Sequence, residues 1–180
     1  MFVNLQKRYV VRTASLLGFA QGLKRRLRLG KKEFNICFVD DNAIRHMNLA
    51  YRGKDKATDV LSFPWNEAGE TLPPETGALA PRRGWGGFAN FLGDVVISVD
   101  TARRNAAAEG HSTPLEIRWL MLHGVLHLLG YDHEHDSGEM IALELALREQ
   151  LGVAGGTPGE KKVKSQKAKG KRQKSGRPRL

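Results

Sequence analysis

Hydrophobic positions along the chain follow two kinds of pattern, and each predicts one kind of secondary structure. Apolar residues three or four apart place their side chains on one face of a helix, whereas short apolar or alternating runs favour strands. Five segments are predicted as helices: 10–29, 40–51, 100–109, 115–129 and 139–151. Segment 100–109 is predicted as a helix because it is rich in alanine. Four segments are predicted as strands: 2–6, 33–39, 58–63 and 93–99.

Segment 115–129 differs from the other predicted helices because its apolar residues lie nearly all round the helix. They are Leu115, Trp119, Leu120, Leu122, Leu126 and Leu129. A helix that is hydrophobic on almost every side is typical of the interior of a domain. Ser112 or Thr113 is suited to cap this helix, with Pro114 in its first turn. We therefore expect a buried central helix.

The same helix carries His123 and His127, whose spacing of four residues puts both side chains on one face. Gly130 follows, where a helix can end in a left-handed conformation that costs glycine little. The chain can then turn back and bring His133 to the same point. Three imidazoles, with a fourth position left for water, are typical of a catalytic zinc site.

Several details of this candidate metal site stay open at the level of sequence. Zn²⁺ suits three neutral imidazoles, although Ni²⁺, Cu²⁺ or Fe²⁺ also fit three nitrogen ligands. His135 is the alternative to His133 as the third ligand. Asp132 and Asp136 are near enough in the sequence to orient a ligand histidine, but either is equally suited to forming the turn.

The residue after the first histidine bears on the reaction. A zinc peptidase of the HExxH type has glutamate there as the general base, whereas this chain has Gly124, so peptide hydrolysis by that route lacks its proton acceptor. A small residue is also expected there if the buried helix packs closely. A phosphodiester is the better candidate substrate, because its hydrolysis needs an activated water and charge stabilisation. Arg52, at a predicted turn, has the fork geometry that matches phosphate.

Basic residues are concentrated at one end of the chain. Residues 161–180 hold ten of the 29 lysines and arginines and no acidic residue, which leaves 19 basic against 19 acidic residues elsewhere. We expect one folded domain over 1–152, with a long loop at 66–92 that is rich in glycine and proline. Residues 153–180 are expected to be a linker and a disordered tail that contacts phosphate non-specifically.

The cellular location is predicted from three features. Cys37, the single cysteine, lies in an apolar run and is expected to be a buried thiol. The sequence has no signal-peptide pattern and no apolar run long enough to span a bilayer. We therefore expect a cytoplasmic protein that does not enter the membrane.

Three segments together resemble the YbeY family of bacterial rRNA maturation factors, which are metal-dependent single-strand endoribonucleases. The segments are 48–64 (NLAYRGKDKATDVLSFP), 92–98 (LGDVVIS) and 123–133 (HGVLHLLGYDH). They occur in the family's order, and the resemblance covers about residues 1–152. It implies an α+β fold, in which a small, mostly four-stranded sheet and about five helices pack around the histidine-bearing central helix.

The resemblance also implies a site and a function. One zinc ion would be held by His123, His127 and His133, and Arg52 would join these histidines as a catalytic residue. The implied activity is cleavage of single-stranded RNA, in maturation of the 16S rRNA 3′ end and in ribosome quality control, with the small ribosomal subunit as partner. One departure is Trp119, which stands where family members often carry a further histidine.

Two other functions remain alternatives. The first is a metallopeptidase with zincin-like histidine spacing, which Gly124 disfavours. The second is a non-catalytic RNA-binding factor of ribosome assembly, in which the metal only stabilises the fold.

Overall fold

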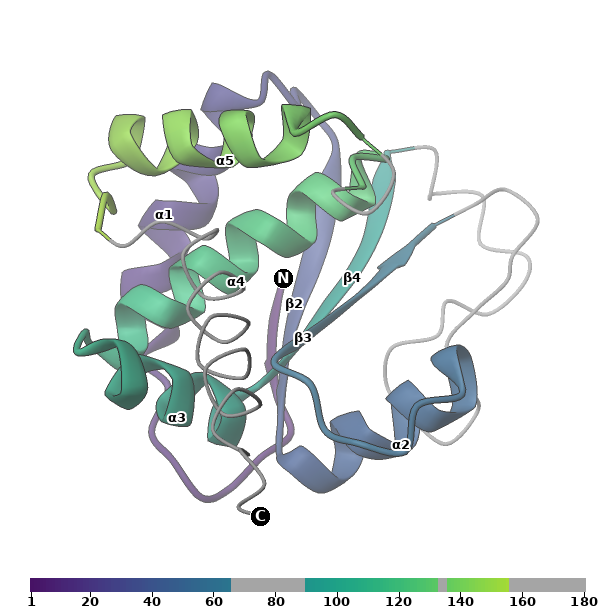
Figure 1. Cartoon of the computed structure of the whole chain (residues 1–180). Helices are drawn as coiled ribbons and strands as arrows, with labels where there is room; N and C mark the ends of the chain where they lie inside the picture. The colour runs from purple at the N-terminus through teal and green to yellow at the C-terminus, as the bar shows by residue number, and fades with distance from the viewer. Residues whose placement is uncertain (66–89, 133–135, 156–180) are drawn as a thin grey trace, which may run out of the picture.

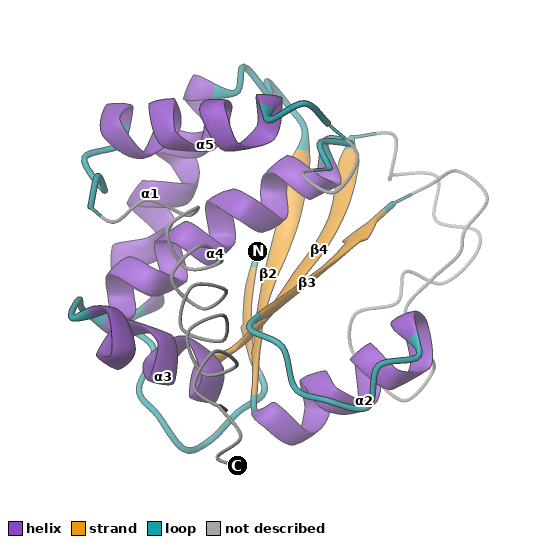
Figure 2. Cartoon of the chain, in the orientation of Figure 1, coloured by secondary structure: helices purple, strands orange, loops and turns teal. Residues whose placement is uncertain are grey.

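The computed structural model describes residues 1–65, 90–132 and 136–155. Within these ranges the chain forms a four-stranded sheet with helices on both of its faces (Figures 1 and 2). The strands are β1 (Phe2–Asn4), β2 (Glu33–Val39), β3 (Val60–Pro64) and β4 (Phe91–Ser98). The helices are α1 (Thr13–Arg26), α2 (Asp41–Arg52), α3 (Val99–Glu109), α4 (Thr113–Leu128) and α5 (Glu139–Gln150). The predicted α+β architecture and its nine elements are confirmed.

Some sequence predictions lie partly or wholly outside the described residues. They concern most of the 66–92 loop, the tail beyond residue 155, and both His133 and His135. Among the described elements, α1 begins at Thr13 and not at Val10. The residues before it form a turn, in which the side-chain oxygen of Gln6 accepts hydrogen bonds from the backbone nitrogens of Arg8 and Tyr9.

The strand order is β1-β2-β4-β3, with β1, β2 and β4 parallel and β3 antiparallel to β4. The two central strands are β2 and β4, and Val95, Val96 and Ile97 of β4 are fully buried. Continuous burial of this kind is typical of a strand that is covered on both faces. Pro64 ends β3, which is an edge strand and so tolerates the missing backbone donor.

Alternating side chains of the sheet belong to two separate hydrophobic cores. On one face, Phe38 and Val95 pack with residues of α1, α3, α4 and α5. On the other face, Cys37 and Val96 pack with Ile44 and Met47 of α2. The prediction of a buried thiol is confirmed, and burial raises the pKa of Cys37 to about 12.

Helix α4 is the centre of the larger core. Ten of its 16 residues are buried, and it packs against β3, β4, α1, α3 and α5. Its large apolar side chains therefore have partners on nearly every side, as the sequence pattern predicts. This packing fixes α4 in the domain and with it the direction of its histidines.

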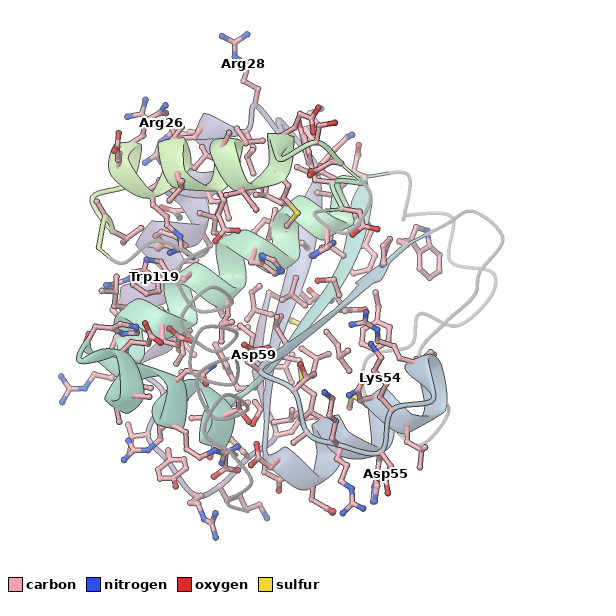
Figure 3. All side chains as sticks on the ribbon, in the orientation of Figure 1. Arg26, Arg28, Lys54, Asp55, Asp59 and Trp119 are labelled. Atoms are coloured by element: carbon pink, nitrogen blue, oxygen red, sulfur yellow. The ribbon has the colours of Figure 1, made fainter. Side chains whose placement is uncertain are left out.

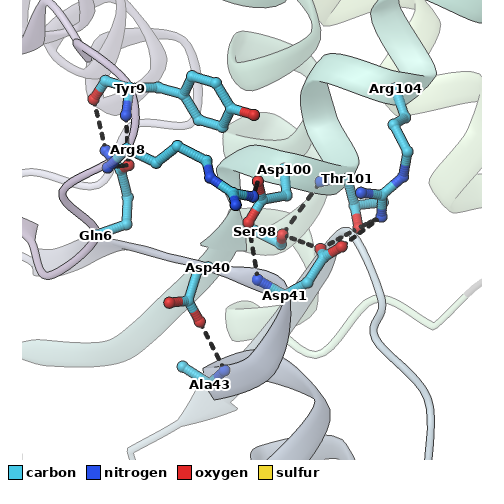
Figure 4. Close-up of polar contacts among 10 residues, drawn as sticks. All are labelled: Gln6, Arg8, Tyr9, Asp40, Asp41, Ala43, Ser98, Asp100, Thr101 and Arg104. Atoms are coloured by element: carbon cyan, nitrogen blue, oxygen red, sulfur yellow. Dashed lines mark hydrogen bonds and ion pairs between the residues drawn. The ribbon is translucent and has the colours of Figure 1, made fainter.

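Polar contacts join the beginnings of α2 and α3 at the ends of β2 and β4 (Figure 4). The carboxylate of Asp41 accepts hydrogen bonds from the hydroxyls of Ser98, at 2.6 Å, and Thr101, at 2.7 Å, and pairs with Arg104. The carboxylate of Asp100 accepts from the backbone nitrogen of Asp41 at 3.1 Å. These contacts hold α2 and α3 in fixed positions on opposite faces of the sheet.

Candidate active site

His123 and His127 meet on one face of α4, as their spacing predicts. Their Nε2 atoms are 3.1 Å apart, and their rings are inclined at 74° with centroids 4.7 Å apart. Two nitrogens bound to one tetrahedral zinc ion at 2.0–2.1 Å lie about 3.3 Å from each other. Both side chains are half-buried, so their ring nitrogens face each other at the surface of the core.

The outer nitrogen of His123 has a carboxylate partner from another helix. Nδ1 of His123 donates a hydrogen bond to Oε2 of Glu144 on α5 at 3.0 Å. Because a carboxylate only accepts, Nδ1 carries the hydrogen and the lone pair of Nε2 is directed toward His127. A ligand histidine usually donates its other N–H to a carboxylate in this way, so the pair fits a metal ion.

Glu144 is itself held by buried partners. Arg148, one turn further along α5, forms an ion pair with its carboxylate. The guanidinium of Arg148 lies over the ring of Trp119 on α4, 4.3 Å from its centroid, and the indole nitrogen donates to the carbonyl of Val153 at 2.8 Å. Trp119 therefore supports the arginine behind the candidate site.

The charge of Glu144 is compatible with its burial because two basic groups accompany it. Burial alone would raise the pKa of this carboxyl, but the hydrogen bond from His123 and the ion pair with Arg148 outweigh that effect and lower it. The side chain is only 4% exposed. A buried carboxylate therefore faces the histidine pair.

Gly124 lies where α4 comes closest to the sheet. Its carbonyl accepts a hydrogen bond from the hydroxyl of Ser62 on β3 at 3.1 Å. A Cβ at this position would be 2.4 Å from Cγ1 of Val95, which is a severe overlap. The close-packing explanation for this glycine is confirmed, and a glutamate has no room here while α4 keeps this position.

The chain turns after the histidine pair as the sequence predicts. Helix α4 ends at Leu128, and Gly130 takes a left-handed conformation with φ of 90°. Asp136 then accepts hydrogen bonds from the backbone nitrogens of Gly138 and Met140, each at 2.8 Å. Of its two possible roles, Asp136 has the turn-forming one. Gly138 directly precedes α5, which begins at Glu139 as predicted.

The third metal ligand remains a prediction. His133 and the alternative His135 lie outside the described residues. Among residues 1–65, 90–132 and 136–155, no group of three or more histidine, cysteine or carboxylate side chains is placed to hold an ion. The structure therefore brings together two of the three predicted ligands.

Arg52 belongs to a different element from the histidines. It is the exposed last residue of α2, on the face of the sheet opposite α4, and makes no ion pair with any described residue. Figure 3 shows its near neighbours Lys54 and Asp55 at this end of α2, across the sheet from Trp119. The edge strand β3 lies between, with Phe63 in edge contact with Tyr51 at 4.9 Å. The role of Arg52 remains a prediction.

Glu144 is the residue of the candidate site that the sequence did not reveal. One signal for it was present, because it is an acidic residue among the inward-facing positions of α5, between Met140 and Leu147. A charged residue on a buried helix face needs a partner. The partner, however, is 21 positions away and becomes evident only when α5 packs on α4.

A histidine pair on a buried helix, with a carboxylate behind it, defines a candidate metal-dependent hydrolase in an α+β domain. A sequence profile described as Endoribonuclease YbeY matches residues 5–152. The chain belongs to the YbeY family, a family of nuclease hydrolases, as the three motifs imply.

Relatives with the same name agree with this assignment. An endoribonuclease YbeY of Desulforamulus reducens is 50% identical over 123 residues, which cover 67% of this chain and 73% of that protein. One of Aquifex aeolicus is 42% identical over 139 residues, covering 77% and 81%. A solution structure from Thermotoga maritima has a similar fold, with a TM-score of 0.53 and 22% identity over 89% of this chain and 99% of that one. None of the helices in the described ranges is long and apolar enough to cross a membrane.

Proposed function

We propose that this chain is a metal-dependent endoribonuclease that cleaves single-stranded RNA, with one zinc ion held by His123, His127 and His133. The observation that carries the proposal is the pair of facing Nε2 atoms, 3.1 Å apart, with Glu144 bound to the far side of His123. Family membership supports the nuclease activity, since the matching relatives are named endoribonucleases.

Each residue has a distinct part in this proposal. A zinc ion bound by imidazoles lowers the pKa of a water molecule and makes it a nucleophile near neutral pH. His123 and His127 supply two nitrogens, and Glu144 fixes the ring and tautomer of His123 and strengthens it as a donor. Arg52 binds a phosphoryl oxygen of the RNA, because its exposed guanidinium makes no ion pair with any described residue.

We also propose the cellular role that the resemblance implies. The chain would act in the cytoplasm on the small ribosomal subunit, in maturing the 3′ end of 16S rRNA and in ribosome quality control. The family membership supports this role, and the ten basic residues of 161–180 suit a polyanionic partner.

The two alternatives make different predictions for the same measurements. A metallopeptidase would cleave casein, although Gly124 stands where its general base is needed. An assembly factor with a structural metal would bind metal and RNA and cleave neither polymer.

One panel of variants separates the three functions. Bound metal, cleavage of single-stranded RNA and cleavage of casein are measured for the wild type, His127→Ala and Arg52→Ala. His46→Ala is the matched control, because His46 is an exposed histidine on α2. RNA cleavage that is lost in both test variants and kept in the control, with folding intact, supports the proposal. Casein cleavage, or metal without either activity, contradicts it.

A further inference from the structure

A pocket of about 700 Å³ lies between α1, the middle of α4 and the residues that follow α5. The side of α1 that borders it has small residues at Ser15, Gly18 and Gly22, which leave the space open. Three arginines line it, Arg25 and Arg26 from the end of α1 and Arg118 from α4. In the view of Figure 3, Arg26 projects from the surface near α5.

The charge in this pocket is uncompensated. No acidic side chain is among the described residues that line it, and none of its three arginines forms an ion pair within the described part of the chain. Some arginines elsewhere in the domain are paired, as Arg45 is with Asp55 and Arg104 with Asp41. Since the chain outside 161–180 has equal numbers of acidic and basic residues, three unpaired guanidinium groups around one cavity are a local excess.

This combination of charge and shape suits phosphate groups of a polymer. A guanidinium binds phosphate through two parallel hydrogen bonds and keeps its charge at any physiological pH. The pocket is much larger than a single phosphate ion, and three arginines from two helices offer contacts to more than one phosphate. A groove with several arginines is the kind of surface that follows a nucleic-acid backbone.

The pocket is separate from the histidine pair. Arg118 precedes His123 on α4 by five residues, which is a rotation of about 140° and a rise of about 8 Å. The arginines therefore lie on another side of the central helix from the imidazoles. A strand bound at both places must be several nucleotides long.

We propose that this arginine pocket, lined by Arg25, Arg26 and Arg118, is a second binding site for the phosphodiester backbone of single-stranded RNA. The site raises affinity for long substrates and takes no part in bond cleavage. The inference rests on the proposed function, since it assumes that the substrate is RNA.

The test compares RNA binding by the full-length chain and three triple variants. The pocket variant replaces Arg25, Arg26 and Arg118 by glutamine, and a charge-retaining variant replaces the same three by lysine. The matched control replaces the exposed Lys7, Lys31 and Lys32, which are outside the pocket lining, by glutamine. Fluorescence anisotropy gives the affinity for oligouridylates of about 5 and about 20 nucleotides, in EDTA and over a range of salt concentrations.

We expect the pocket variant to bind the longer RNA about tenfold more weakly. The slope of the logarithm of the binding constant against the logarithm of the salt concentration should become smaller by about two, since each single-strand phosphate contact contributes about 0.7 to it. The pocket variant's binding of the shorter RNA, which cannot reach both sites at once, should weaken less, and the lysine variant should keep most of the affinity. In cleavage assays with metal, KM for the longer RNA should rise without a change in kcat.

Equal weakening by the pocket and control variants would overturn the inference, because it would show a general effect of charge. Inorganic phosphate that binds the wild type but not the pocket variant, while both proteins bind the longer RNA equally well, would assign the pocket to a small anion instead. Because binding is measured in EDTA, a wild type that fails to cleave RNA contradicts only the proposed function.

Discussion

The carboxylate of Glu144 lies 3.0 Å from Nδ1 of His123, although 21 positions of sequence separate the two residues. The contact forms because α5 packs on α4 and buries both Glu144 and its partner Arg148. The direction of the imidazole thus depends on a helix that contributes no predicted metal ligand.

Glu144→Gln should weaken zinc binding about 10- to 100-fold, since the change removes the charge that orients His123 and strengthens it as a ligand. A competition titration with a chromophoric zinc chelator measures the dissociation constant directly. Glu149→Gln, at an exposed position on the same helix, is the control and should leave the constant unchanged. Equal constants for both variants and the wild type would show that Glu144 does not support the ligand.

Arg148→Met should lower the free energy of unfolding by about 3 kcal/mol, because it leaves the charge of Glu144 buried with one partner fewer. Urea denaturation measures the change. The comparison is Arg104→Met, which breaks an ion pair with Asp41 whose arginine side chain is 60% exposed. Exposed pairs contribute at most about 1 kcal/mol, so similar losses in the two variants would refute this account of Arg148.

Gly124→Ala should lower the free energy of unfolding by about 1–3 kcal/mol, because the added methyl group overlaps Val95 and the well-packed helix has to move. The double variant Gly124→Ala with Val95→Ala should lose less free energy of unfolding than the sum of the losses of the two single variants. Urea denaturation of the single and double variants tests this coupling. Strict additivity would mean that the two positions do not compete for space.

Asp94→Asn should make the domain more stable at neutral pH. Burial raises the pKa of Asp94, and the hydrogen bond from Asn35 and the charge of the amino terminus only partly offset it. A carboxyl whose pKa is higher in the folded chain than in the unfolded chain destabilises the fold when the pH is above the folded-state pKa. This destabilisation disappears as the pH falls through the folded-state pKa. The advantage of the variant should therefore shrink in acid, as thermal unfolding from pH 7 to about pH 4 would reveal.

The matched control for the Asp94 experiment is Asp55→Asn, which should change the stability at neutral pH in the opposite direction. The ion pair with Arg45 lowers the pKa of Asp55, so this carboxylate stabilises the folded chain above its unfolded pKa. The control should be the less stable protein at neutral pH and should approach the wild type in acid. Parallel pH profiles for the two variants would contradict the assigned environments.

We propose that residues 161–180 add non-specific affinity for RNA. Replacing their ten lysines and arginines by glutamine should weaken binding of single-stranded RNA at low salt and reduce its salt dependence. The kcat for a short RNA should be unchanged. Anisotropy titrations at several salt concentrations test the prediction, and unchanged affinity at low salt would exclude this role for the tail.

The elements of the fold follow from local pattern, so the sequence predicts them well. The alternation and apolar runs place β2 at Glu33–Val39, and the four-residue spacing places His123 and His127 on one face of α4. Gly130 follows the end of α4, and it adopts a left-handed conformation that glycine takes at little cost. Each of these features depends on residues that are close in the sequence.

Features that depend on tertiary packing were not evident from the sequence. The strand order places β4 between β2 and β3, and no local pattern specifies such a pairing. Asn48 is a polar residue that is buried on α2, where its side chain donates to the carbonyl of Lys56 at 2.8 Å. The partnership of Glu144 with His123, and the pocket shared by Arg25 and Arg118, likewise require elements from distant parts of the chain.

We propose above that RNA cleavage requires a metal ion held by the histidine pair. The most direct measurement is the rate of single-stranded RNA cleavage as zinc is added back to protein stripped with a chelator, for the wild type, His127→Ala and His46→Ala. We expect the wild type and His46→Ala to gain activity up to one equivalent of zinc, and His127→Ala to stay inactive while folded. Cleavage that persists in the stripped wild type, or that zinc restores equally in His127→Ala, would contradict this proposal.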